Sequence, residues 1–202
     1  MGWESPITLL HKATVVTKAS IPMNILSALR LGPKKTNVND LYQIIVTHSR
    51  RPVFYTVLGV PDTVNGRYDV IMLHAYIVMK RLRAIGAEAS TTSQALFDWM
   101  FADMDKNLRE MGVGDLSVGK KVKTMATAYY GRIKAYDEGL EGGQELLADA
   151  LRRNLFAEAK PTDQQVTDMA GLLSDQVEAS SSWSLVDIKK GAITFITPPN
   201  DA

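Results

Sequence analysis

The chain has 202 residues, a hydrophobic fraction of 46% and a formal net charge of +1, which suits one globular domain and excludes a largely disordered chain. It contains no cysteine, so disulfides, thiolate metal sites and cysteine nucleophiles are excluded. Charge is graded along the sequence. Residues 1–55 carry seven basic and two acidic side chains, whereas residues 161–202 carry two basic and six acidic ones. This gradient is a first indication of where partners bind.

The first 36 residues are expected to form a poorly ordered basic extension ahead of a helical domain over residues 37–202. No apolar run reaches the roughly 18–20 residues that cross a bilayer, and Glu4 stands where a secretory signal carries basic residues. The stretch from Met23 to Lys35 has two interpretations. It either forms a short amphipathic helix that touches an anionic membrane or belongs to a frayed terminus.

The pattern from Asn37 onward is helical almost throughout. Asn39 is a candidate cap for a helix that stops at Arg51-Pro52, and a short apolar piece follows. The stretch Gly59–Gly66 contains Pro, Asp and an Asn-Gly pair, so we expect a loop there. Residues 67–84 are apolar on nearly every side, which predicts a central buried helix.

Two amphipathic helices are expected next, over residues 93–111 and 118–140, separated by the Gly112–Gly114 turn. Apolar side chains in the second helix recur at steps of three and four: Val118, Val122, Met125, Tyr129, Ile133, Tyr136 and Leu140. Further helices are expected over 144–156 and 162–182, followed by a helical turn and an extended piece over 192–197. The sequence predicts an all-α fold, a single compact bundle of about six to seven helices with a short extended C-terminal tail.

One motif imitates a phosphate-binding loop. Residues Gly114-Asp-Leu-Ser-Val-Gly119-Lys120 match G-x-x-x-x-G-K, but such a loop follows a strand and ends with a Ser or Thr that binds Mg²⁺. Here a helix is expected before it, and Lys121 takes the place of the hydroxyl. Nucleotide hydrolysis is therefore not expected.

The remaining candidate ligands also lack the right spacing. Asp103-x-Asp105-x-Asn107 begins like a calcium loop, but Leu108 replaces the required Gly. The histidines His11, His48 and His74 share no ligand spacing, and His74 is expected to be a satisfied core histidine. No catalytic residue, metal or cofactor is expected.

Lys120, Lys121 and Lys123 crowd the expected first turns of the 118–140 helix. Cations there oppose the helix dipole at about 0.3–1 kcal/mol each. The lysines either meet an acidic or anionic partner, pair locally with Glu110 or Asp115, or are simply solvated. The nine Met residues likewise suit either a surface that binds varied apolar segments or an ordinary core.

A set of short motifs carries a family resemblance: Leu41-Tyr42, Arg51-Pro-Val-Phe-Tyr55, Leu58-Gly-Val-Pro-Asp62, Asn65-Gly-Arg-Tyr-Asp69, Gln94-Ala-Leu-Phe-Asp98, the string Asp103-Met-Asp-Lys-Asn-Leu-Arg-Glu-Met-Gly-Val-Gly-Asp115, Lys120-Lys-Val-Lys123 and Tyr130-Gly-Arg132. Over about residues 40–140 the chain resembles the ubiquinol–cytochrome c chaperone family, in its compact alphaproteobacterial form. The resemblance implies a non-enzymatic assembly factor of the cytochrome bc1 complex. Relatives accompany newly made cytochrome b near the ribosomal exit tunnel.

The expected partners are cytochrome b or another bc1 subunit as client, together with a ribosome or an anionic membrane surface, and no specific DNA. An apolar groove is expected between the 93–111 and 118–140 helices. The candidate partner-binding residues are Asp103, Asp105, Arg109, Asp115, Lys120, Lys121, Lys123 and Arg132.

The expected location is the cytoplasm, at the periphery of the inner membrane, or the matrix side in a mitochondrion. The alternative function is a ribosome- or nucleic-acid-associated adaptor that uses the basic first 55 residues. Salt dependence separates the two functions, because binding to polyanions weakens steeply with salt and apolar capture does not.

Overall fold

The computed structural model describes residues 38–198. The predicted extension over residues 1–36, including the stretch from Met23 to Lys35, lies outside the described residues. Among those described, every regular element is a helix, which confirms the predicted all-α fold. No helix in this part of the chain is long and apolar enough to cross a membrane.

The helices follow one another with short connections. They are α2 (Val38–Ser49), α3 (Val53–Thr56), α4 (Val64–Ile85), the 3-10 turn η2 (Ala87–Ala89), α5 (Ser90–Glu110), α6 (Asp115–Gly142), α7 (Gln144–Asn154), α8 (Asp163–Ala179), the 3-10 turn η3 (Ser180–Ser182) and α9 (Leu185–Lys190).

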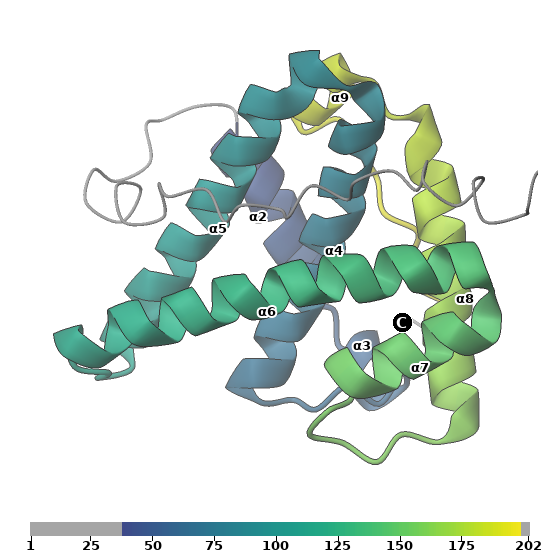
Figure 1. The fold of residues 1–202 in the computed structure, drawn as a ribbon, viewed down its shortest axis with the longest axis horizontal. Coiled ribbons are helices and arrows are strands. Elements are labelled where there is room, and N and C mark those ends of the chain that lie inside the picture. The colour runs from purple at the N-terminus through teal and green to yellow at the C-terminus, as the bar shows by residue number, and fades with distance from the viewer. Residues whose placement is uncertain (1–37, 199–202) are drawn as a thin grey trace, which may run out of the picture.

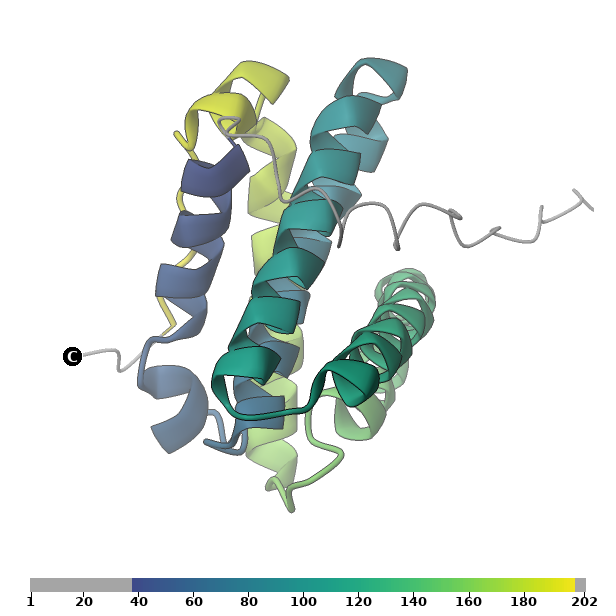
Figure 2. The same cartoon turned by 90° about the vertical axis from the view of Figure 1, so that its left-hand side faces the viewer.

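The helices form two groups that cross one another (Figures 1 and 2). Helices α2, α4, α5 and α8 run roughly along one another, while α6 crosses in front of α4 and α7 returns beside α6 (Figure 1). In the turned view α6 and α7 are seen nearly end-on against the upright α2 and α5 (Figure 2). The crossing leaves the N-terminal half of α6 supported mainly by α5, whereas its C-terminal half packs closely on α7.

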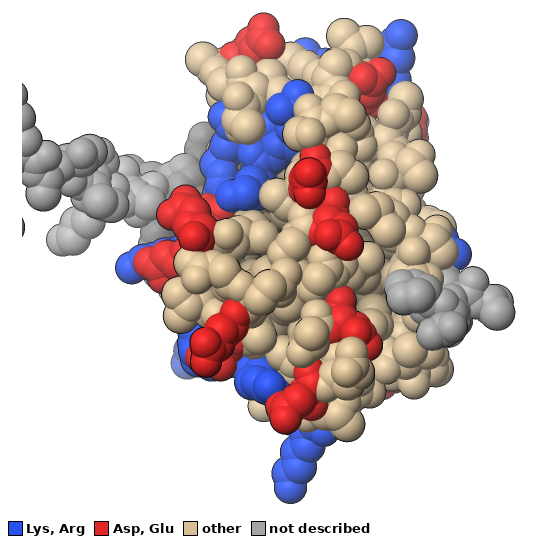
Figure 3. Space-filling view, turned by 90° about the vertical axis from the view of Figure 1, so that its right-hand side faces the viewer, with Lys and Arg blue, Asp and Glu red and all other residues tan. Residues whose placement is uncertain are grey.

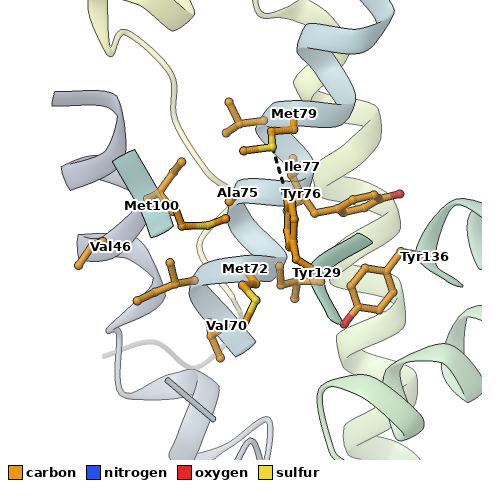
Figure 4. Close-up of a cluster of buried hydrophobic side chains, with 14 of the residues drawn as sticks. Val46, Val70, Met72, Ala75, Tyr76, Ile77, Met79, Met100, Tyr129 and Tyr136 are labelled. Atoms are coloured by element: carbon orange, nitrogen blue, oxygen red, sulfur yellow. Dashed lines mark hydrogen bonds between the residues drawn. The ribbon is translucent and has the colours of Figure 1, made fainter. Parts of the chain in front are cut away.

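Helix α4 is the centre of the core, as its all-round hydrophobicity predicts. Side chains on every face of it are buried, and the cluster in Figure 4 collects partners from α2, α5 and α6 around it. The Tyr129 hydroxyl donates a hydrogen bond to the Met79 sulfur at 3.2 Å, and the Tyr76 and Tyr136 rings meet edge to face. Several methionines, including Met72, Met79 and Met100, are core residues.

The C-terminal half of α6 is anchored by close packing and by charge. A Cβ on Gly139 would lie 2.8 Å from the Leu147 Cα, so a glycine is needed where α6 and α7 approach each other. Asp137 accepts hydrogen bonds from Tyr76 and Lys80, both at 2.7 Å, and from Arg83. These contacts join α6 to α4.

Two predicted boundaries are wrong. Helix α2 already begins at Val38, so Asn39 lies inside its first turn rather than at the cap. Helix α4 begins at Val64, and Asn65-Gly66 is part of the helix instead of a loop, because Thr63 caps it by accepting from the Gly66 N–H at 3.1 Å. Gly66 also lies against Pro61, whose carbonyl oxygen would be 2.0 Å from an added Cβ. Gly66 is thus needed because the Pro61 backbone lies so close to the start of α4.

The C-terminal tail closes the bundle. Residues 192–198, where an extended piece was predicted over 192–197, form no helix or strand and bury Ile193 and Phe195 against the core. The tail also donates the Ile196 N–H to the Gln176 side chain of α8. It therefore belongs to the packed interior.

Candidate functional site

A groove of about 820 Å³ opens between α4 and the N-terminal half of α6. Its other walls are the end of α5, the α5–α6 turn and the connection between α7 and α8. The apolar side chains that line it are Val64, Met72, Leu108, Met111, Val113, Met125, Ala128 and Ala157. We call this surface the α4–α6 groove.

Three of the residues that line the groove are methionines, one from each of three elements: Met72, Met111 and Met125. Unbranched thioether side chains adapt their shape to different apolar surfaces. The sequence left open whether the methionines serve the core or a binding surface. The structure shows methionines in both places. Met111 is 49% exposed at the surface, whereas Met72 is buried beneath the groove.

Asp69 and Arg132 form an ion pair in the groove wall. Their side chains are only 16% and 15% exposed, and the Arg132 Nη2 lies 2.6 Å from the Asp69 carboxylate. Burial raises the pKa of Asp69 to about 6, although the Arg132 charge pulls it down. The Arg132 Nε is buried and has no acceptor among residues 38–198. The Arg132 Nε–H therefore remains able to donate a hydrogen bond to an acceptor on a bound segment, once the side chain shifts enough to expose it.

Lys120 and Lys121 stand at the rim of the groove, and Lys123 lies on the exposed side of α6. The predicted conflict with the helix dipole is wrong, because α6 begins at Asp115 and all three lysines lie beyond its first turn. The alternative of local pairing does not hold either. Asp115 pairs with Arg109, Glu110 pairs with Lys106, and no described acidic side chain lies within 4 Å of the three lysines.

The other predicted partner-binding residues take part in contacts within the fold. Asp103 accepts a hydrogen bond from the Tyr42 hydroxyl at 2.9 Å, which ties α5 to α2. Arg109 bridges Asp105, one helical turn before it, and Asp115 across the α5–α6 turn. Of the eight residues, Lys120, Lys121 and Arg132 line the groove, and the other five do not.

The two stretches that imitate a phosphate-binding loop and a calcium loop are both helical. Residues 115–120 of the G-x-x-x-x-G-K stretch are the first turns of α6, so the backbone that would surround a phosphate is folded as helix. Asp103, Asp105 and Asn107 lie on α5 rather than in a loop. Among residues 38–198, no three His, Asp or Glu side chains are grouped so as to hold a metal ion.

A second polar pair, the buried His74 and the partly buried His48, lies beneath the C-terminal tail. His74 donates its Nδ1–H to the Val70 carbonyl at 2.8 Å, so its Nε2 accepts from His48 Nδ1 at 3.0 Å. The rings of Phe54 and Phe195 lie about 5 Å from that of His74. Burial lowers the pKa of His74 to about 3. His74 is therefore the core histidine that the sequence predicted.

Sequence reasoning missed the α4 wall of the groove and the role of Asp69. It expected α5 to form the wall opposite α6, but α5 contributes only Leu108. The available signal was Asp69, the single acidic residue of α4, directly before its long apolar run. Asp69 stands one residue before the buried Val70, where a carboxylate needs a partner.

An all-helical scaffold that leaves an apolar groove with a charged rim is typical of modules that bind a segment of another protein. The comparisons with known proteins identify the family. The family model described as Ubiquinol-cytochrome C chaperone matches residues 56–195. The chain belongs to this family, as its motifs indicated.

The relatives have corresponding names. The human protein named Ubiquinol-cytochrome c reductase complex assembly factor 1 is 26% identical over 155 residues, which cover 76% of this chain and 52% of the human one. Protein CBP3, mitochondrial, from Saccharomyces cerevisiae is 30% identical over 149 residues, covering 72% of this chain and 44% of its own. The chain thus spans about half the length of the curated relatives it matches.

A solved bacterial structure has the same fold. The crystal structure of the Cbp3 homolog from Brucella abortus superimposes with a TM-score of 0.72 at 28% identity, covering 82% of this chain and 92% of that one. The expected likeness to a bacterial member of the family is confirmed by this match.

Proposed function

We propose that this protein is a non-enzymatic assembly factor for the cytochrome bc1 complex, and that the α4–α6 groove holds an apolar segment of newly made cytochrome b. The observation that carries the proposal is the groove itself, which is open, lined by methionine and aliphatic side chains, and built in a chain of this chaperone family. The names of the relatives support the bc1 complex as the destination of the client. The proposed location is the cytoplasmic side of the inner membrane.

The contacts of the groove fit a helical segment that has a polar end. The apolar lining covers nonpolar side chains, and burial of such surface contributes about 25 cal/mol per Å². Lys120 and Lys121 at the rim meet an acidic or carbonyl-rich end of the segment. The buried Arg132 provides one further donor. The α4–α6 groove therefore selects segments that are apolar along one face and negative at one end.

The family-level part of this proposal is tested by deleting the gene in the native organism. We expect the reduced-minus-oxidised absorbance of cytochrome b and the ubiquinol oxidation activity of bc1 to fall together. Reintroduction of the wild-type gene restores both signals. Normal bc1 assembly in the deletion strain contradicts the proposal.

The groove is tested separately by filling it. Ala128 lines the groove and is exposed, so Ala128→Trp blocks it without disturbing the core. The matched control is Thr127→Trp, one residue away on the outer side of α6 and also exposed. We expect the deletion strain to regain cytochrome b with the control but not with Ala128→Trp. Equal rescue by both variants means that the client binds elsewhere.

Salt dependence tests the competing adaptor function. Capture of an apolar client by the α4–α6 groove changes little with salt, whereas binding to RNA through basic residues falls steeply. The measurement is recovery of cytochrome b with the purified chain at about 50 and 200 mM salt. A loss of more than about a hundredfold between these conditions favours the polyanion-binding adaptor.

A further inference from the structure

The α5–α6 turn forms one end of the longest axis of the molecule (Figure 1). The large apolar side chains Leu116 and Met111 stand there, 99% and 49% exposed. Leu116 is the most exposed large hydrophobic residue among those described. An aliphatic side chain in that position contributes nothing to the core, so the fold itself does not explain it.

Lysines surround this apolar apex. Leu116, Lys120 and Lys123 are spaced i, i+4 and i+7, which puts them on one face of α6. Lys121 lies about 140° round the helix from Leu116, on the side that lines the groove. The nearby Asp105, Glu110 and Asp115 pair with Arg109 and Lys106, so three carboxylates face two cations. None of the three lysines is paired with a described acidic side chain, and these eight groups together leave an excess of positive charge at the turn.

We propose that the α5–α6 turn is a membrane-contacting tip. Leu116 and Met111 enter the interface of an anionic bilayer, while Lys120, Lys121 and Lys123 lie against its headgroups. An aliphatic apex with a basic collar matches the two layers of such an interface. Single-stranded RNA is bound instead by aromatic side chains that stack on bases, and the turn offers none. The far end of the molecule contrasts with the tip.

The far end faces the viewer in Figure 3, where acidic side chains are spread over the middle of the surface and basic ones gather at the upper left and the lower edge. Helix α8, which lies at that end, carries four acidic side chains and no basic one. An anionic surface repels this end and attracts the lysines of the tip. The acidic helix α8 thus favours the orientation in which the tip faces the bilayer.

This inference goes beyond the proposed function, because lipid contact at the tip needs no client. It also places the α4–α6 groove relative to the bilayer. Met111, Lys120 and Lys121 belong to both surfaces, so the groove opens beside the tip. A segment that leaves the groove meets the bilayer directly.

The test is co-sedimentation of the full chain with phosphatidylcholine vesicles that contain roughly one phosphatidylglycerol in three lipids, against pure phosphatidylcholine vesicles. We expect binding to the anionic vesicles only. Leu116→Glu should weaken it at least about tenfold, because it removes apolar insertion and adds a repelled charge. The matched control is Leu146→Glu, at an exposed leucine of α7 that is 53% accessible and remote from the tip. This control should bind as the wild type does.

Charge is tested with a second matched pair. Changing Lys120, Lys121 and Lys123 together to Gln should weaken binding about a hundredfold, since each lysine near an anionic surface contributes about fivefold. The same change at Lys134, Lys189 and Lys190 should have a much smaller effect. Wild-type binding by Leu116→Glu overturns the proposal, as does loss of binding in both lysine variants alike. Polyuridine RNA provides a further test. If it displaces the protein from the vesicles, and Leu116→Glu does not change its own binding, the lysines belong to a nucleic-acid site and the membrane proposal is overturned.

Discussion

The two buried polar pairs of this molecule differ in charge and in access. Asp69 and Arg132 carry opposite charges and lie in the wall of the α4–α6 groove, where about one sixth of each side chain is exposed. His48 and His74 share a hydrogen bond beneath the C-terminal tail, where His74 is held neutral by burial. A charged pair is tolerated where solvent or a partner reaches it, whereas the fully buried His74 is held neutral. The groove wall is therefore ready for a polar contact.

The largest expected loss of stability comes from removing the aromatic ring that covers the His48–His74 pair. Phe195→Ala removes the ring that packs on His48, His74 and Trp183, and we expect the free energy of unfolding to fall by about 3–4 kcal/mol. Urea denaturation measures it. Thr194→Ala, at the exposed neighbour, should change it by less than about 0.5 kcal/mol. A small effect of Phe195→Ala means that the tail does not seal the pair.

Acid should destabilise the His48–His74 pair. The folded-state pKa of His74 is about 3 and the ordinary value is 6.5, so the unfolded chain takes up the proton first. The stabilisation is complete above pH 6.5 and is lost as the pH falls toward 3. Relative to His74→Leu, the wild type should lose about 2 kcal/mol between pH 7 and about pH 5. Parallel pH profiles for the two proteins contradict this expectation.

The pH dependence of stability that comes from the Asp69–Arg132 pair should have the opposite sign. The folded-state pKa of Asp69 is about 6 and its ordinary value is 3.8, so the folded chain takes up the proton first. Its stabilising contribution is present below pH 3.8 and is lost as the pH rises through 6. Relative to Asp69→Asn, the wild type should gain about 1–2 kcal/mol between pH 7 and about pH 5. A wild-type loss over this range means that the Arg132 charge outweighs burial.

The smallest effect is expected at the rim of the groove. Changing Lys120, Lys121 and Lys123 together to Gln should shift the free energy of unfolding by less than about 0.5 kcal/mol, since none has a described acidic partner. Thermal unfolding followed by circular dichroism checks this. A large loss of stability would give the lysines a structural role and weaken their assignment to a partner.

Local patterns in the sequence predicted much of the fold. The buried positions Val118, Val122, Tyr129 and Tyr136 of α6 confirm the spacing of three and four, and the all-round apolar segment is the central α4. These features depend on neighbours within one or two helical turns. The Asn65-Gly66 error was also local, because the cap at Thr63 and the close approach of Pro61, rather than a turn, explain the glycine.

The candidate site was predicted less well because it depends on contacts between distant segments. The lysines and Arg132 were singled out, but their surroundings were not. Asp69 and Arg132 are 63 residues apart, and His48 and His74 are 26 apart. No periodicity within a helix indicates such pairs. Only the crossing of α6 over α4 creates the groove and its ion pair.

The buried tail has a consequence for how the chain acquires its fold during synthesis. Ile193 and Phe195 complete the interior between α2 and α4, yet they are made more than 140 residues after α2 begins at Val38. A nascent chain that stops before residue 193 leaves Phe54 and the histidine pair uncovered. Translation therefore delivers the closing contact of the bundle late, and the interior is covered only once residues 193–195 have been made.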